Sequence, residues 1–135
     1  MKIRVIDELP LVSVTLIQNN RQVTLPNVLL DTGSAGCVVS TDNLRESVIG
    51  PMPGAMIRRI TGIGGAEFVI ETFVDSLQAD QLQATQFTIE IGAVSYGYDF
   101  DGILGFDFLQ QAQAIIDLST MELRPSRLTK YATLP

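Results

Sequence analysis

Histidine is absent from this chain of 135 residues, and cysteine occurs once, as Cys37. Without histidine, Ser-His and Cys-His nucleophilic catalysis is excluded, and so is every metal site built on imidazole ligands. A single cysteine forms no internal disulfide, and one thiol without histidine excludes a structural zinc site. The acid–base groups that remain are carboxylates, lysines, tyrosines and Cys37.

Charge is also scarce, since only 18% of the residues are charged and the net charge is −6. An acidic chain gains no counterion-release affinity from phosphates, so we expect neither nucleic acid nor an anionic membrane surface as a partner. No apolar run approaches the ~20 residues that a membrane-spanning helix needs. Residues 1–8 turn acidic too early for a signal peptide. A cytoplasmic protein is the default expectation, although a domain of a larger precursor would have the same features.

The length suits one compact domain over residues 1–135. Strand patterns dominate. Residues 11–25 are expected to form a hairpin that Pro26-Asn27 interrupts, and residues 55–60 and 66–74 a long hairpin with a glycine-rich tip. Further strands are expected at 28–30, 37–39, 86–94, 102–105, 114–118 and 121–124, and short helices at 41–46 and 106–114. The sum is a mostly β fold with one or two short helices.

An aspartate ends the wholly apolar run Val28-Leu29-Leu30, which is unusual. A carboxylate near a buried strand is costly unless it is hydrogen-bonded or shares a proton. Asp31 is followed by Thr32-Gly33-Ser34, in which glycine permits a sharp turn and close approach by another chain. Alone, Asp-Thr-Gly is a short motif, and an ordinary Asp-Gly turn is the plainer interpretation.

Three motifs in order change that interpretation. A hairpin from Pro10 leads into residues 28–35, the glycine-rich segment 60–65 follows, and Gly102-Ile103-Leu104-Gly105-Phe106 comes last. Together they resemble the retropepsin-like aspartic proteases, the retroviral-type enzymes and their cellular and bacterial relatives. The resemblance covers about residues 10–124. It implies a closed β-barrel with a flap hairpin, and an aspartic endopeptidase that hydrolyses peptide bonds.

The resemblance implies that Asp31 is catalytic, with one copy from each subunit of a homodimer. The chain has one Asp-Thr-Gly and is too short for a two-lobed enzyme, so a two-fold dimer follows. Two facing carboxylates share one proton, so that one activates water and the other polarises the scissile carbonyl. Thr32, Gly33 and Ser34 would support the catalytic loop.

The remaining roles come from the same resemblance. Substrate binding and the flap fall to Ala35, Ile60, Thr61, Gly62, Ile63, Gly64 and Gly65, and the supporting core element to Ile103, Leu104 and Gly105. Val38, Ile63 and Ile103 are expected to line pockets. The expected partners are a second copy of the chain and a peptide or unfolded-protein substrate. No metal and no cofactor are expected.

Two positions depart from the retroviral pattern. Retroviral enzymes commonly carry an acidic residue and an arginine where this chain has Ala35 and Phe106, so that ion pair is missing. This departure keeps open an alternative, a catalytically inactive dimeric peptide-binding or assembly module of the same fold. Cys37 is expected to be a buried, inert thiol rather than a redox regulator.

Other site types fit less well. Gly62-Ile63-Gly64-Gly65 lacks the spacing and the lysine of a nucleotide-binding loop. Asp99, Asp101 and Asp107 lack the twelve-residue pattern of a calcium loop, and a solvated acidic loop is the plainer interpretation.

Overall fold

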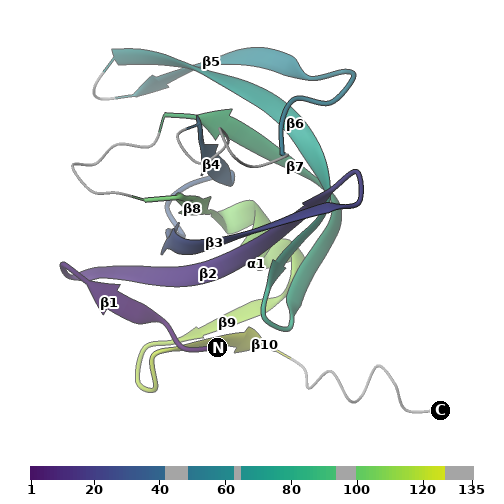
Figure 1. Cartoon of the computed structure of the whole chain (residues 1–135). Coiled ribbons are helices and arrows are strands. Elements are labelled where there is room, and N and C mark those ends of the chain that lie inside the picture. Colours follow the sequence, from purple (N-terminus) through teal and green to yellow (C-terminus); the bar gives the residue numbers. More distant parts are fainter. Residues whose placement is uncertain (42–48, 63–64, 94–99, 127–135) are drawn as a thin grey trace.

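The computed structural model describes residues 1–41, 49–62, 65–93 and 100–126, and for residues 60–62 and 65–67 it describes the backbone alone. Most of the described chain is β-strand, as predicted (Figure 1). The strands are β1 (Arg4–Ile6), β2 (Leu9–Gln18), β3 (Arg21–Leu30), β4 (Val38–Ser40), β5 (Met56–Gly62), β6 (Gly65–Ala79), β7 (Leu82–Gly92), β8 (Gly102–Leu104), β9 (Ala114–Asp117) and β10 (Glu122–Pro125). The helix α1 spans Phe106–Gln111. No helix in the described part is long and apolar enough to cross a membrane.

Eight strands form one sheet in the order β1-β2-β3-β8-β4-β7-β6-β5. Strand β2 also pairs with β6, with Leu16 opposite Leu77. The strands β2-β3-β8-β4-β7-β6 therefore form a closed ring. The outer strands β1 and β5 stay outside the closed ring. A separate hairpin, β9–β10, lies beside the N-terminus, where Lys2 bridges to Glu122.

The short strand β8 lies between two strands that are close together in sequence. It runs parallel to β3, with Leu30 opposite Leu104, and antiparallel to β4, with Val38 opposite Ile103. The chain between β3 and β4 therefore loops around the end of β8. Because β8 is buried at every position, this crossing fixes the loop from the inside.

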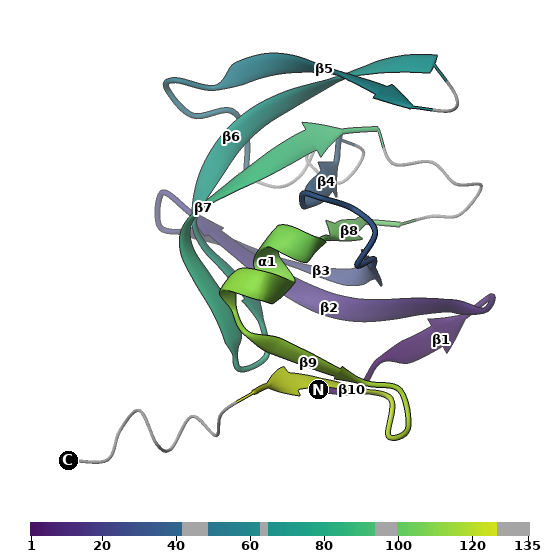
Figure 2. The ribbon, with the colours of Figure 1, turned by 180° about the vertical axis from the view of Figure 1, so that it is seen from behind.

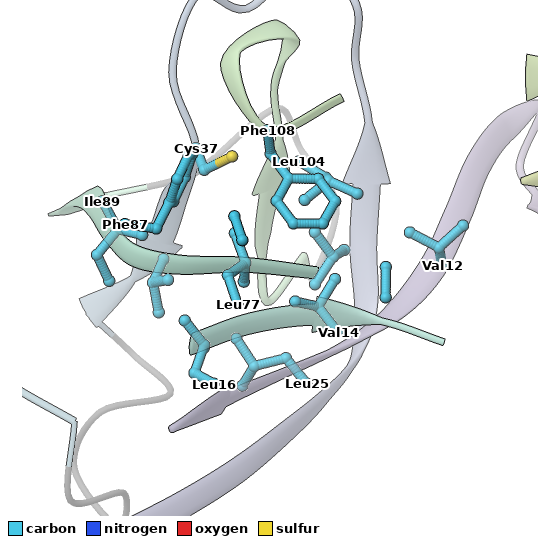
Figure 3. Close-up of a cluster of buried hydrophobic side chains, with 14 of the residues drawn as sticks. Val12, Val14, Leu16, Leu25, Cys37, Leu77, Phe87, Ile89, Leu104 and Phe108 are labelled. Carbon is cyan, nitrogen blue, oxygen red and sulfur yellow. The ribbon is translucent and has the colours of Figure 1, made fainter. Parts of the chain in front are cut away.

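The main core fills the closed sheet and is covered by α1, which lies across it in the rear view (Figure 2). Phe108 of α1 is fully buried and meets Phe87 edge-on, with ring centroids 5.9 Å apart. Figure 3 shows these rings with Cys37, Leu104 and Ile89 in the same cluster. Burying such aromatic and aliphatic side chains contributes about 1.5–3 kcal/mol each. The polar face of α1, including Gln110, points to solvent.

Strand β3 corrects one expectation, because it runs through Pro26-Asn27 without interruption. The register of β2 with β3 shifts at this point, so that Pro26 and Asn27 lie opposite the single residue Ser13. This is a β-bulge, which accommodates a proline because the ladder is already broken there. Pro26 is exposed.

Other boundaries differ by a few residues. Helix α1 ends at Gln111 rather than at residue 114, because Gln113 adopts a left-handed conformation (φ 54°) and the chain continues as β9. Strand β6 extends beyond the predicted end to Ala79, and β7 covers Leu82–Gly92 rather than 86–94. Strand β1 was not predicted. The expected helix at 41–46 falls almost entirely outside the described residues.

Candidate active site

Asp31 follows β3 directly and is half-buried. Its backbone amide donates to the carbonyl oxygen of Leu104 at 3.1 Å, which extends the β3–β8 pairing by one residue. Its side-chain Oδ1 accepts the amide of Gly33 at 2.9 Å. Both the backbone and the carboxylate of Asp31 are therefore held by neighbouring backbone groups.

Residues 31–36 form a tight loop, called here the candidate catalytic loop. The amide of Ser34 donates to the carbonyl oxygen of Asp31 at 3.2 Å, and the Ser34 hydroxyl donates to the carbonyl oxygen of Gly36 at 2.8 Å. The start of α1 binds the loop from behind, because the amide of Phe106 donates to Ser34 O at 2.7 Å and that of Asp107 to Ala35 O at 3.3 Å. Such satisfied backbone groups make the loop a rigid support for a carboxylate.

Gly105 lets the supporting element approach this loop. A Cβ atom at Gly105 would lie 2.1 Å from the carbonyl oxygen of Gly36 and 2.8 Å from that of Ser34. The structure thus places Ile103, Leu104 and Gly105 directly behind the candidate catalytic loop, and it has no room for a side chain at Gly105.

The outer side of the loop is open. Thr32, Gly33 and Ala35 are exposed in the single chain, and the Phe106 side chain is 49% exposed. Ala35 and Phe106 are the two positions that depart from the retroviral pattern. There, Ala35 accepts a backbone hydrogen bond from Asp107, the residue after Phe106.

Strand β5 and the first part of β6 form a hairpin at one edge of the sheet (Figure 1), and β6 pairs with β7 from Ile70 onward. Its strands stay in register up to the pair Gly62–Gly65. In both views this closing end lies on the same side of the molecule as the end of β3, where Asp31 follows. The expected flap residues Ile60, Thr61, Gly62 and Gly65 lie in these two strands, and Ile63 and Gly64 lie outside the described residues.

Comparison with known proteins identifies the family of this chain. The family described as aspartyl protease matches residues 12–108. The chain belongs to the aspartyl protease family. Among solved structures, it is similar to EIAV protease complexed with the inhibitor HBY-793, with a TM-score of 0.61 and 24% sequence identity over 84% of this chain and 96% of that chain. At this identity, the likeness shows a shared fold. No curated protein matches the chain.

In this aspartyl protease family member a second apolar cluster lies beside the candidate catalytic loop. Leu29 and Ile103 belong to it, whereas their neighbours Leu30 and Leu104 belong to the main core, so the cluster lies on the opposite face of β3 and β8. Its buried members are Leu11, Leu29, Phe100 and Ile103, and Leu9 and Val38 pack against them. Two expected pocket residues, Val38 and Ile103, are therefore together. Sequence reasoning missed Phe100 and Leu29, although the uniformly apolar run 28–30 carried the signal for Leu29.

A charged network joins the hairpin to the loop. Arg58 of β5 contacts Glu71 of β6 at 2.6 Å and Glu90 of β7 at 3.5 Å. Glu90 lies next to Gly36, since a Cβ atom there would be 3.4 Å from Glu90 Oε1. Burial raises the pKa of Glu90, the Arg58 charge opposes this, and the carboxylates of Glu71 and Asp107 add to the rise. Sequence patterns carried no signal for these contacts.

Cys37 lies at the far end of the loop and is buried, as expected. Its thiol donates to Asp107 Oδ1 at 3.3 Å, and its sulfur accepts the amide of Gly105 at 3.3 Å. Burial raises the pKa of Cys37 far above its usual range, and the Asp107 charge adds to this effect. The thiol therefore stays protonated and is a poor nucleophile.

Proposed function

We propose that this chain is one subunit of a homodimeric aspartic endopeptidase, in which Asp31 of each copy contributes one carboxylate to a shared pair. The observation that carries the proposal is the placement of Asp31. It ends a buried strand, its amide is bound by Leu104, and its carboxylate is oriented by the Gly33 amide, in a member of the aspartyl protease family.

The chemistry needs both copies. Two carboxylates within a few ångströms do not both ionise cheaply, so the pair holds one proton between them. The ionised member takes a proton from a water as that water attacks the peptide carbon. The protonated member donates its proton to the carbonyl oxygen, which gives a tetrahedral intermediate. The proton taken from water then passes to the amide nitrogen as the C–N bond breaks, and a hydroxyl proton of the intermediate returns to the pair. Because Gly33 holds one oxygen of Asp31, the carboxylate presents a fixed orientation to its counterpart.

The dimer brings together the exposed sides of two candidate catalytic loops. Thr32 is exposed in the single chain, and in the dimer its hydroxyl would bond across the two-fold axis. Phe106, half exposed beside the loop, would add apolar contact where retroviral enzymes place an ion pair. An isologous interface of this kind repeats every contact twice.

The substrate is an extended peptide, bound between the β5–β6 hairpin and the loop. An extended peptide gains main-chain hydrogen bonds as an added strand, and its alternate side chains enter pockets. The second apolar cluster, with Ile103 and Val38 next to the loop, would form the walls of these pockets. Apolar residues beside the cleaved bond fit this lining.

A second candidate keeps the fold and the dimer but has no turnover. It is favoured by the loss of the retroviral ion pair at Ala35 and Phe106, which leaves a backbone contact there. Such a module would bind extended peptides without cutting them.

One experiment separates the two candidates. Cleavage of an unstructured protein is followed between pH 3 and pH 7 with the wild type, Asp31→Asn and the control Asp80→Asn. The control makes the same chemical change at an exposed turn residue whose left-handed backbone (φ 54°) suits asparagine. The peptidase predicts cleavage by the wild type and the control but not by Asp31→Asn. Cleavage by Asp31→Asn at the wild-type rate excludes the proposed dyad, and no cleavage by any of the three favours the binding module.

A further inference from the structure

We propose that Cys37 and Asp107 form a thiol–carboxylate clamp that positions the candidate catalytic loop, a role that rests on the proposed function of Asp31. Neither side chain takes part in the reaction described above. Their place is behind the loop, between its last residue and the first turn of α1.

The clamp has two ends. At one end, the Cys37 thiol donates to Asp107 Oδ1 at 3.3 Å. At the other, the amide of Asp107 donates to Ala35 O at 3.3 Å, so that Asp107 binds the chain on both sides of Gly36. Oδ1 of Asp107 also accepts the amide of Phe108 at 2.7 Å, which fixes the carboxylate on the helix.

Cys37 connects this pair to the turn that holds Asp31. Its sulfur accepts the amide of Gly105 at 3.3 Å. The residue before Gly105 accepts the amide of Asp31, and the residue after it donates to Ser34 O. The segment 104–106 therefore forms hydrogen bonds to three residues, which are Asp31, Ser34 and Cys37. Removing the sulfur removes one of the three.

The hydrogen-bonding properties of the Cys37 thiol suit a structural role behind the candidate catalytic loop. The thiol is buried and protonated, so it acts as a donor to the carboxylate and as an acceptor for an amide at the same time. A hydrogen bond to an ionised acceptor is stronger than one between neutral groups, which compensates for the weak donor strength of a thiol. Access for a redox reaction is poor, because Cys37 is 3% exposed.

Two substitutions of nearly equal volume test the clamp. Cys37→Ser keeps a donor to Asp107 and an acceptor for Gly105, whereas Cys37→Ala keeps neither. We expect kcat of the alanine variant to fall about tenfold with KM nearly unchanged, because a small displacement of a reacting group is costly. The serine variant is expected to retain kcat within about threefold of the wild type, since the hydroxyl restores both bonds. Equal kcat values for the two variants would overturn the proposal.

A second readout needs no turnover. Hydrogen exchange is measured at the amides of Gly33, Gly105 and Phe106, which report on the carboxylate, the sulfur and the loop. The amide of Ile89, a fully buried residue of β7, serves as the reference for global opening. We expect faster exchange at the three amides in Cys37→Ala, restoration in Cys37→Ser, and an unchanged reference.

The two readouts distinguish the possible failures. A wild type without turnover contradicts the proposed peptidase, while exchange still decides whether the clamp exists. Exchange that rises equally at Ile89 and at the amides of Gly33, Gly105 and Phe106 means a general loss of stability, and it overturns the positioning role. The same holds if alanine and serine give identical exchange at Gly33 and Phe106.

Discussion

The backbone amide of Asp31 donates a hydrogen bond to the carbonyl oxygen of Leu104, with 3.1 Å between nitrogen and oxygen. This bond continues the parallel pairing of Leu30 with Leu104 past the end of β3. The aspartate is thereby held by a strand far away in the sequence. The next residue, Gly105, lies against the backbone of the candidate catalytic loop, so the position of Asp31 depends on how closely that turn approaches.

Gly105→Ala is expected to destabilise the protein by about 3 kcal/mol, the size of effect seen when an atom is forced into a filled space. Its Cβ would lie 2.1 Å from Gly36 O and 2.8 Å from Ser34 O, and both are backbone atoms that cannot rotate away. The free energy of unfolding, measured by urea titration, checks this expectation.

Gly50→Ala is the matched control. Among the described residues other than its two chain neighbours, no heavy atom lies within 4 Å of a Cβ at Gly50. The hydrogen bonds between its backbone and Gln18 do not involve its hydrogen atoms on Cα. We expect a change within about 0.5 kcal/mol, or a slight gain from a stiffer unfolded chain. If the two alanine variants unfold at the same urea concentration, the close approach at Gly105 carries no stability.

The sequence predicted the parts of the site that have a local signature. Asp31 follows three apolar residues, and Gly105 follows a second apolar run, so both buried strands and the glycine between β8 and α1 were expected from pattern alone. The hairpin tip was marked by its glycines. What could not be predicted is the register between distant strands. The contact of Arg58 with Glu90 depends on the pairing of three strands, and no local pattern encodes it.

The bulge at Pro26 and the clamp at Cys37 could not be predicted from the sequence, for related reasons. Proline usually ends a strand, and only the two-for-one pairing with Ser13 reveals that this strand continues. Cys37 was recognised as buried from its apolar neighbours. Its partner Asp107, however, comes from the first turn of α1, and that helix reaches the loop only through the crossing of β8 between β3 and β4.

While the protein is folded, Cys37 is expected to be unreactive toward a thiol reagent such as a chromogenic aromatic disulfide. Burial raises the pKa of the thiol, so at pH 8 the reactive thiolate is almost absent, and the side chain is out of reach of the reagent. The Thr120→Cys variant adds an exposed thiol in the β9–β10 turn as an internal control. Mass spectrometry should find one fast modification in the folded variant and two in urea. Rapid labelling of Cys37 in the native wild type would contradict the buried position.

Asp117 is expected to contribute stability that disappears in acid. The Ser119 hydroxyl, the Arg124 guanidinium and the Thr120 amide hold the pKa of Asp117 well below its usual range. Because the folded pKa is lowered, the contribution is present above the unfolded value of about 3.9 and is lost as the pH falls toward the folded value. Asp117→Asn should therefore have a lower melting temperature than the wild type at pH 7, and the difference should shrink below pH 4.

The exposed residue Glu8 provides the control for Asp117. Glu8→Gln removes one negative charge from the turn between β1 and β2, where the side chain is exposed. Surface charges of this kind contribute little, so its melting temperature should follow that of the wild type across the same pH range. If Asp117→Asn behaves like Glu8→Gln, the hydrogen bonds around Asp117 do not stabilise the fold.

Mixing subunits tests whether two chains share one site. Above the dissociation constant of the dimer, wild type is held constant and Asp31→Asn is added, with time allowed for exchange. Random pairing then lowers the activity to about a half at an equal amount of the variant and to about a tenth at ninefold excess, because a mixed dimer has only one Asp31 in the shared pair. The exposed-site variant Asp80→Asn, added in the same amounts, retains Asp31 and should increase the activity in proportion to the chains added. A constant rate on addition of Asp31→Asn would mean that each wild-type chain works alone, and that Asp31 meets no second copy in the active enzyme.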